Sequence, residues 1–399
     1  MPLSVLHNCT LIDIENRVCR HNQSVVIKDK LIEYIGSAKE FSESFLADCK
    51  THDLSDKYII PGLIDSHVHI FEEPDDILYK DFRIDENLDI ALKRGMKHLD
   101  VMLAAGITTV REMGTIERRN ITLRNLARQE INKPELVVSG NPITHSGGHF
   151  VSRCRIVDNE FQMQKAVDEE LNAGADFIKI NNTIKVGIPQ KTIEAAVSIA
   201  QKSGTFVACH SYTHSAMKTA IEAGVHTLEH VADFNQELID QMREKGIIPI
   251  PTFVAAFDSI PALNPEANIE ILVKTIPDAS MSDFVEWYNW QVQNLPTLFN
   301  AGLEFGIGTD AGFVPTTFDS LHREMDLLCK LGATPWQVLI AATIGSAKAL
   351  GKDKEMGIIK KGMAANIVVL DYDPTLNIKN SKSINSVVLM GKFIPSQSK

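Results

Sequence analysis

The chain has 399 residues, is 44% hydrophobic and carries a formal net charge of −11. Its length predicts one large domain with a smaller appendage, and its acidic balance without a Lys/Arg run argues against a nucleic-acid-binding protein. No apolar stretch approaches the roughly 18 residues of a membrane helix or resembles a signal peptide, so no membrane partner is expected. The 6 cysteines form no CxxC pair, which favours reduced thiols and a cytoplasmic location.

The chain begins with short β-rich pieces and changes its pattern at residue 59. Strands are expected at 3–14, 22–28 and 31–35, separated by polar turns. From residue 59, apolar strands alternate with helical segments, which predicts βα units around a parallel sheet. The strands expected in this part are 59–64, 107–111, 136–139, 176–180, 205–210, 226–230, 247–252 and 304–309. The helices expected between them include 89–105, 162–173, 190–203 and 215–223.

These elements predict an α/β protein whose main domain is a (β/α)8 TIM barrel over residues 59–355. Chemistry on such a barrel lies at the C-terminal ends of the strands. After Leu350 the chain returns to short strands, at 365–372 and 384–390. We expect the two β-rich ends, residues 1–58 and 356–399, to pair into a small β-sandwich beside the barrel.

Two histidines follow the first expected barrel strand. The apolar run 59–64 leads directly into His67 and His69. Side chains two residues apart on a strand share a face, so both imidazoles can reach one point. Histidine is a common metal ligand, which makes the pair a candidate metal site. Two histidines that merely hydrogen bond at a strand end are the alternative.

Lys179 interrupts an otherwise apolar strand. A buried ammonium group is costly unless it is paired or neutralised. An ion pair with Asp176 or another barrel carboxylate is the interpretation that physics favours. The functional alternative is a lysine carbamylated by carbon dioxide, because this modification turns the cation into an anion whose two oxygens can bridge two metal ions.

Three further candidate ligands, His210, His230 and Asp310, end expected strands. His226 shares a strand face with His230 but lies lower on the strand, so we interpret it as a hydrogen-bonded core residue. Cys209 directly precedes a candidate ligand and would point to the opposite face, which favours packing over a nucleophilic role.

The order of these candidate ligands along the chain resembles that of the amidohydrolase superfamily of metal-dependent hydrolases. The pattern of that superfamily is HxH after the first strand, Lys after the fourth, His after the fifth and the sixth, and Asp after the eighth. Those positions are held here by His67, His69, Lys179, His210, His230 and Asp310. Segments 207–213 and 220–230, with Gly147, Gly148 and His149, resemble the branch of imidazolonepropionases and Xaa-Pro dipeptidase (prolidase)-like enzymes. One departure is the stretch 150–153, where carboxypeptidase-like members often have a Gly-Asp pair.

The resemblance implies a binuclear centre that holds two divalent metal ions, with zinc as the expected metal. One ion would be bound by His67, His69 and Asp310. The other would be bound by His210 and His230, with a carbamate on Lys179 as the bridge. A metal-activated hydroxide would attack the scissile carbonyl, and Asp310 would pass its proton to the leaving nitrogen.

The implied reaction is cleavage of a carbon–nitrogen bond in a small-molecule or dipeptide-like substrate. A dipeptidase, a carboxypeptidase-like enzyme or an N-acyl-amino-acid hydrolase is the leading interpretation. Hydrolysis of another amide, a urea or a cyclic amide, as in imidazolonepropionase, is the alternative, and a homo-oligomer is left open. Thr213 stands where related deaminases carry Glu, which argues against deamination. A non-catalytic relative is disfavoured because every expected ligand is present.

By the same resemblance, Tyr212 and His149 are the residues expected to contact the substrate and assist catalysis. Tyrosine and histidine both carry suitable donors, although packing would explain Tyr212 equally well. His145, in the same loop as His149, is either a second contact or an ordinary loop residue.

Arg111 ends the second expected strand. It could hold a substrate carboxylate, but pairing with an internal acid such as Glu112 or Asp65 is favoured. The aromatic-rich segment 253–296 is either a pocket wall that sets specificity or the seventh barrel helix.

Overall fold

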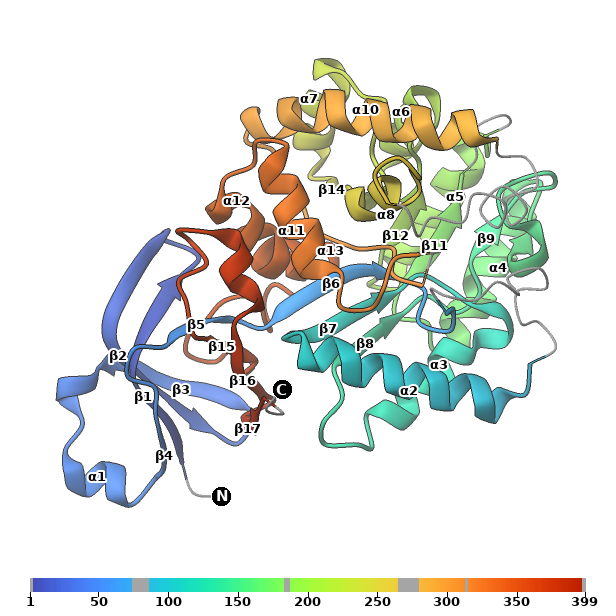
Figure 1. Cartoon of the computed structure of the whole chain (residues 1–399). Helices are drawn as coiled ribbons and strands as arrows, with labels where there is room; N and C mark the ends of the chain where they lie inside the picture. The colour runs from blue at the N-terminus through green and yellow to red at the C-terminus, as the bar shows by residue number, and fades with distance from the viewer. Residues whose placement is uncertain (1–2, 74–85, 183–186, 265–279, 313–314, 397–399) are drawn as a thin grey trace.

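The two ends of the chain meet in one sheet (Figure 1). The computed structural model describes residues 3–73, 86–182, 187–264, 280–312 and 315–396. Among them, the sheet runs in the order β17-β16-β15-β5-β1-β2-β3, with β4 beside β1. Its strands are β1 (Ser4–Asp13), β2 (Val18–Lys28), β3 (Leu31–Ser37), β4 (Lys50–Asp53), β5 (Tyr58–Pro61), β15 (Ile367–Leu370), β16 (Ile384–Leu389) and β17 (Lys392–Pro395).

The joint between the two ends is the antiparallel pair of β5 and β15, which aligns Tyr58 with Leu370 and Pro61 with Ile367. A separate apolar cluster that includes Leu6, Ile59 and Val369 packs on this sheet. The expected association of the two ends is therefore confirmed. Its arrangement as a sandwich stays a prediction.

The prediction of a single strand over residues 59–64 is wrong, because this stretch is divided between two strands. The chain leaves the terminal sheet at the end of β5 and enters a parallel sheet at β6 (Leu63–Val68). Gly62 stands at the change, where its amide donates to the Asn366 carbonyl at 2.8 Å. A Cβ at this position would collide with the Thr108 side chain, so the close packing of that side chain against the Gly62 backbone requires glycine.

The centre of the molecule consists of parallel strands, as the α/β prediction requires. In the described residues, one sheet has the order β6-β7-β8 and another the order β10-β9-β11-β12-β13-β14. The further strands are β7 (Ile107–Glu112), β8 (Glu135–Val138), β9 (Ile143–Thr144), β10 (Arg155–Ile156), β11 (Ile178–Asn181), β12 (Val207–His210), β13 (Thr227–Glu229) and β14 (Ile248–Ile250). A backbone hydrogen bond of 2.7 Å from Asp176 to Val138 links the two sheets.

The expected strand 304–309 is not a strand in the structure. The segment nevertheless hydrogen bonds on both sides, from Gly306 to the Pro249 carbonyl at 3.1 Å and from Ser66 to the Ile307 carbonyl at 2.9 Å. A single parallel bridge joins Val68 to Ala311. These isolated bonds hold the segment between β14 and β6 without a continuous ladder.

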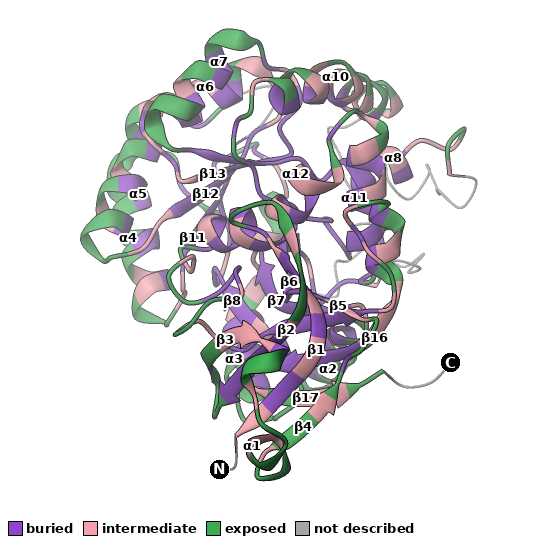
Figure 2. Ribbon diagram, turned by 90° about the vertical axis from the view of Figure 1, so that its left-hand side faces the viewer, coloured by how far each residue is buried: buried purple, intermediate pink, exposed green. Residues whose placement is uncertain are grey.

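Helices cover the outside of the parallel strands, with their buried faces turned inward and exposed faces outward (Figure 2). The expected helices appear as α2, α4, α5 and α6, each within two residues of its predicted bounds. The α-helices of the described residues are α1 (Glu43–Ala47), α2 (Leu88–Ala104), α3 (Arg119–Ala127), α4 (Glu160–Asn172), α5 (Gln190–Lys202), α6 (His214–Ala223), α7 (Gln236–Lys245), α8 (Phe253–Asp258), α10 (Met281–Asn300), α11 (Leu321–Lys330), α12 (Pro335–Ile340) and α13 (Ser346–Ala349). None of the helices in the described ranges is long and apolar enough to cross a membrane.

Candidate metal centre

Three of the predicted ligands, His67, His69 and Asp310, meet at one point, and we call them the first side of the centre. Their ligand atoms all lie within 4.8 Å of one another. The Oδ1 atom of Asp310 is 3.3 Å from Nε2 of His67 and 3.2 Å from Nε2 of His69. His67 lies inside β6, and the backbone of Asp310 is held beside it by a 2.8 Å hydrogen bond to the His67 carbonyl.

Donor atoms without partners indicate that this group fits a metal ion. Within the described part of the chain, Nε2 of His67, Oδ1 of Asp310 and Nε2 of His210 are buried and make no hydrogen bond. A buried polar atom normally has a partner, so such exceptions require an explanation. Burial lowers the pKa of His69 to about 4, which keeps its imidazole neutral and able to donate a lone pair. Two imidazole nitrogens and one carboxylate oxygen form a suitable donor set for a divalent metal.

The second side of the centre comprises Lys179, His210 and His230. The His230 ring lies 4.6 Å from the His210 ring and 4.5 Å from the His67 ring, measured between centroids. The pKa of His210 and of His230 is far below the usual value, because both rings are buried and each has a neighbouring histidine. Nδ1 of His230 hydrogen bonds to Oγ1 of Thr252 at 2.7 Å, which fixes the ring.

Lys179 is buried on β11, next to the strand that carries His210. The prediction that Lys179 pairs with Asp176 is wrong, because Asp176 forms an ion pair with Arg124 at 2.8 Å instead. Across the described residues, the Lys179 ammonium makes no hydrogen bond or ion pair. Burial lowers the pKa of Lys179. Burial and, to a smaller extent, the nearby Lys179 charge lower the pKa of His149 to about 3.

Glu229 is a site residue that the sequence reasoning missed. Its carboxylate accepts a 2.7 Å hydrogen bond from Nδ1 of His67 and a 2.7 Å hydrogen bond from Nη2 of Arg111. Burial alone would raise the pKa of Glu229, but Arg111 and the bond from His67 hold it far below its usual value. With Nδ1 protonated, Nε2 of His67 presents its lone pair to the centre.

The preference for an internal partner of Arg111 is confirmed, but the partner is Glu229 rather than Glu112 or Asp65. Arg111 is fully buried and also donates to the Ser66 carbonyl at 2.6 Å. Asp65 instead accepts from Thr309, and Glu112 accepts from Asn120 and Gly114.

The sequence profile of the Amidohydrolase family matches residues 58–394. The chain belongs to this family. It is therefore a metal-dependent hydrolase that acts on carbon–nitrogen bonds.

Known relatives of this amidohydrolase extend over nearly the whole chain. Ochratoxinase of Aspergillus niger is 23% identical over 93% of the chain and 82% of that protein. Imidazolonepropionase of Geobacillus sp. (strain WCH70) is 23% identical over 88% of the chain and 84% of that protein. A crystal structure of an Xaa-Pro dipeptidase with bound methionine in the active site superimposes with a TM-score of 0.86, at 24% identity, over 98% of this chain and 100% of the other. This last likeness shows the fold.

Two candidate substrate contacts of the amidohydrolase lie beside the second side. The His149 ring stacks on the His210 ring at 4.7 Å, and the half-buried Tyr212 ring is 5.6 Å from the same histidine. His145 is buried, and in the described structure its ring has no hydrogen-bond partner.

Predictions about two neighbouring residues can be compared with the structure. Nε2 of His226 donates to the Lys348 carbonyl at 2.9 Å, which confirms the predicted hydrogen bond, but the side chain is half-buried rather than in the core. Cys209 is buried, and burial raises the pKa of its thiol to about 11, which leaves it a packing residue rather than a nucleophile.

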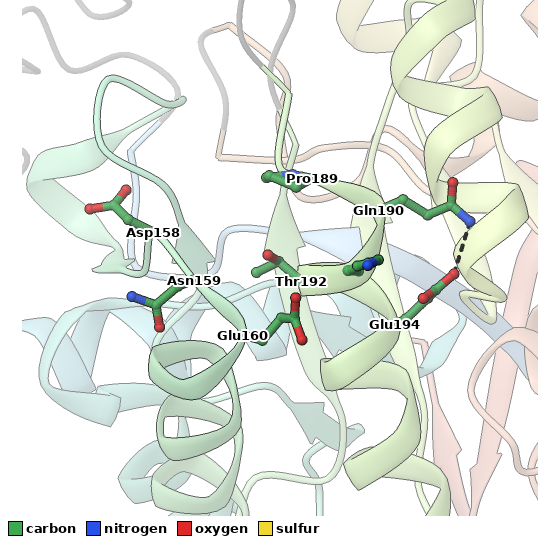
Figure 3. A pocket seen from close by; sticks show the side chains of 8 residues that line it. Asp158, Asn159, Glu160, Pro189, Gln190, Thr192 and Glu194 are labelled. Atoms are coloured by element: carbon green, nitrogen blue, oxygen red, sulfur yellow. Dashed lines mark hydrogen bonds between the residues drawn. The ribbon is translucent and has the colours of Figure 1, made fainter.

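A pocket of about 540 Å³ lies away from these residues, between the N-terminal ends of α4 and α5 (Figure 3). Its lining includes Asp158, Glu160, Lys191 and Glu194, and none of the candidate ligands belongs to it. Because no candidate ligand lines this pocket, we assign the chemistry to the metal centre instead.

Proposed function

We propose that this amidohydrolase binds two divalent metal ions, most simply zinc, and hydrolyses the amide bond of an N-acyl amino acid or a dipeptide. The buried donor atoms without partners on the first side carry this proposal. The first side would hold one ion, and His210 with His230 the other. Lys179 suits a carbamate bridge, because it is buried, its pKa is lowered and it makes no ion pair with a described residue.

Bound divalent ions would supply a Lewis acid and a water molecule of lowered pKa. Asp310 would accept the proton of the attacking water and return it to the leaving nitrogen. Burial raises the pKa of Asp310, but the neighbouring His230 and His67 outweigh this effect and hold the pKa far below its usual value, so the carboxylate is available as a base. Tyr212 and His149 would donate hydrogen bonds to the substrate beside the second side.

The substrate class rests on the relatives. The names ochratoxinase and Xaa-Pro dipeptidase favour an amide or peptide substrate. The similarity to imidazolonepropionase favours a second candidate, a cyclic amide. We further infer that the parallel strands close into a (β/α)8 barrel over residues 59–355, beside a β-sandwich of residues 1–58 and 356–399. The 6 cysteines, all free thiols, support a cytoplasmic location.

Metal content together with hydrolysis tests the proposal. Protein expressed in zinc-supplemented medium should contain about two metal ions per chain by elemental analysis, as expected for a two-metal site. Xaa-Pro and Xaa-Arg dipeptides, N-acyl amino acids and a cyclic amide form the substrate panel. Lys179→Ala should lose metal and activity, whereas the surface variant Lys191→Ala should keep both.

One metal ion per chain, unchanged in Lys179→Ala, would overturn the carbamate-bridged centre. Turnover of the cyclic substrate alone would replace the amino-acid amide with the second candidate. Circular dichroism of both variants shows whether a loss of metal follows from loss of the ligand or from unfolding.

A further inference from the structure

Helix α10 is fastened directly over the second side of the centre; in Figure 1 it runs across the top of the molecule, above β14. The buried Gln291 donates from Nε2 to the Val231 carbonyl at 3.0 Å and to the Pro251 carbonyl at 2.6 Å. Nδ2 of Asn294 donates to the Ala232 carbonyl at 2.7 Å. Val231 and Ala232 directly follow the candidate ligand His230, so these amides fix the position of α10 relative to that ligand.

One turn before Gln291, on the same face of α10, lies Trp287. Its ring is 5.8 Å from the His230 ring and 6.2 Å from the Tyr212 ring. The neighbouring Tyr288 stacks on Phe253 of α8 at 5.7 Å, which restrains rotation of the helix. The indole is therefore held against the side of the centre that Tyr212 and His149 also border.

The indole N–H of Trp287 is buried and, among the described residues, has no acceptor. The side chain is only 8% exposed, so water does not readily replace a partner. Buried tryptophans usually find an acceptor, because an unmade hydrogen bond in the interior carries a free-energy cost. A residue that only packed here could be phenylalanine, and the cost would disappear. The free donor instead suits a bound oxygen.

We propose that Trp287 is a substrate-binding residue whose indole N–H donates to the carbonyl oxygen of the substrate's acyl group. This inference rests on the proposed amide hydrolysis and adds a donor to it. Trp287 contacts His230, and the carbonyl oxygen of an amide cleaved at this centre would lie on that side. The Nε1–H and Tyr212 would then contact the same oxygen, whose negative charge increases during attack by water.

Kinetics of Trp287→Phe give the first test, because phenylalanine keeps an aromatic ring and removes only the N–H donor. A donor to the developing charge predicts a kcat lower by roughly 100-fold with little change in KM, the smaller end of the loss for one oxyanion donor. Trp290→Phe, on the same helix, is the matched control and should retain kcat. Unchanged kcat in Trp287→Phe would overturn the inference.

Fluorescence gives a second readout that does not need turnover. The chain has 3 tryptophans, so Trp290→Phe/Trp336→Phe leaves Trp287 as the single emitter. N-acetyl-L-proline added to this zinc-loaded protein should change the emission saturably, whereas a protein with only Trp290 should not respond. If the emission of Trp287 does not change although the enzyme hydrolyses the panel, the inference about Trp287 is overturned and the proposed function stands. A responding Trp287 without any hydrolysis overturns the proposed function and keeps the residue in a binding site, and failure of both readouts overturns both.

Discussion

The two sides of the metal centre are built differently. On the first side, a fully buried chain of contacts runs from Arg111 through Glu229 to His67, and each of these groups has a charged or hydrogen-bonded partner. On the second side, the His230 ring hydrogen bonds to the Thr252 hydroxyl, and Lys179 has no ion-pair partner in the described structure. The hydrogen bonds of the first side are therefore already made within the protein, whereas Lys179 on the second side makes none with a described residue.

The largest effect is expected from Asp310→Asn. The amide cannot act as the base, and it is a weaker metal ligand than a carboxylate, so we expect kcat to fall by about 10⁴-fold, with metal bound less tightly. Steady-state kinetics and elemental analysis measure the two losses. Asp176→Asn is the control, because Asp176 pairs with Arg124. Activity retained in Asp310→Asn would remove this residue from the reaction.

A smaller loss should follow Glu229→Gln, which keeps the shape but removes the charge between Arg111 and His67. Loss of a carboxylate behind a ligating histidine typically weakens metal binding about 10–100-fold. Competition with a chelator measures this affinity. Glu112→Gln is a matched control, since burial raises the pKa of Glu112 to about 7 and its hydrogen bonds go to Asn120 and Gly114. Equal affinities in the two variants would contradict preorganisation of the first side.

On the second side, Thr252→Val should matter less than Glu229→Gln. The substitution removes one neutral hydrogen bond to His230, which is worth about 1 kcal/mol, so the affinity for the second ion should fall by about 3–10-fold. Metal titration of the variant gives this number. Thr219→Val on the surface of α6 serves as the reference. A loss in Thr252→Val larger than that in Glu229→Gln would reverse the comparison between the two sides.

The grouping of His67, His69 and Asp310 could be predicted from the sequence, because each follows or ends an apolar segment of the parallel layer and their order along the chain is that of the family pattern. The role of Glu229 could not be predicted, because in a regular strand the side chain of Glu229 would point away from that of His230. The backbone of His230 has a φ of 65°, in the left-handed region, and this breaks the alternation of faces. Asp310, with a φ of 58°, also departs from extended geometry. A positive φ at a residue other than glycine has no reliable sequence signal.

The two barrel strands that differ from their prediction both contain a glycine in close contact with a neighbouring strand. At Gly308 an added Cβ would lie 2.6 Å from the Cβ of His67, so the segment before Asp310 packs against β6 at a distance that only glycine permits. The sequence shows the glycine but not its neighbour. The outer helices, in contrast, follow from local periodicity and glycine ends, and they appear close to where they were predicted.

A further expected effect concerns the stability of the fold rather than metal binding, and it comes from Glu324 of α11. Its carboxylate accepts backbone hydrogen bonds from Phe253 and Val254, next to the turn that places Thr252 against His230. Burial, together with nearby acids, raises the pKa of Glu324 to about 8. The folded protein then keeps this proton up to a higher pH than the unfolded chain, so the free energy of unfolding contributed by Glu324 is full below about pH 4.5 and is lost as the pH rises to about 8.

Glu324→Gln should remove this dependence. The change amounts to about 3–4 kcal/mol between pH 5 and 8, since the pKa rises from 4.5 to about 8 and one pKa unit corresponds to about 1.4 kcal/mol. Urea denaturation at both pH values measures it, with the exposed Glu237→Gln as the control. If the variant loses as much stability as the wild type over this range, the carboxylate is already charged in the folded protein. Glu324 would then hold the Thr252 turn as an anion at neutral pH, and the second side would be more firmly supported than its contacts to His230 alone suggest.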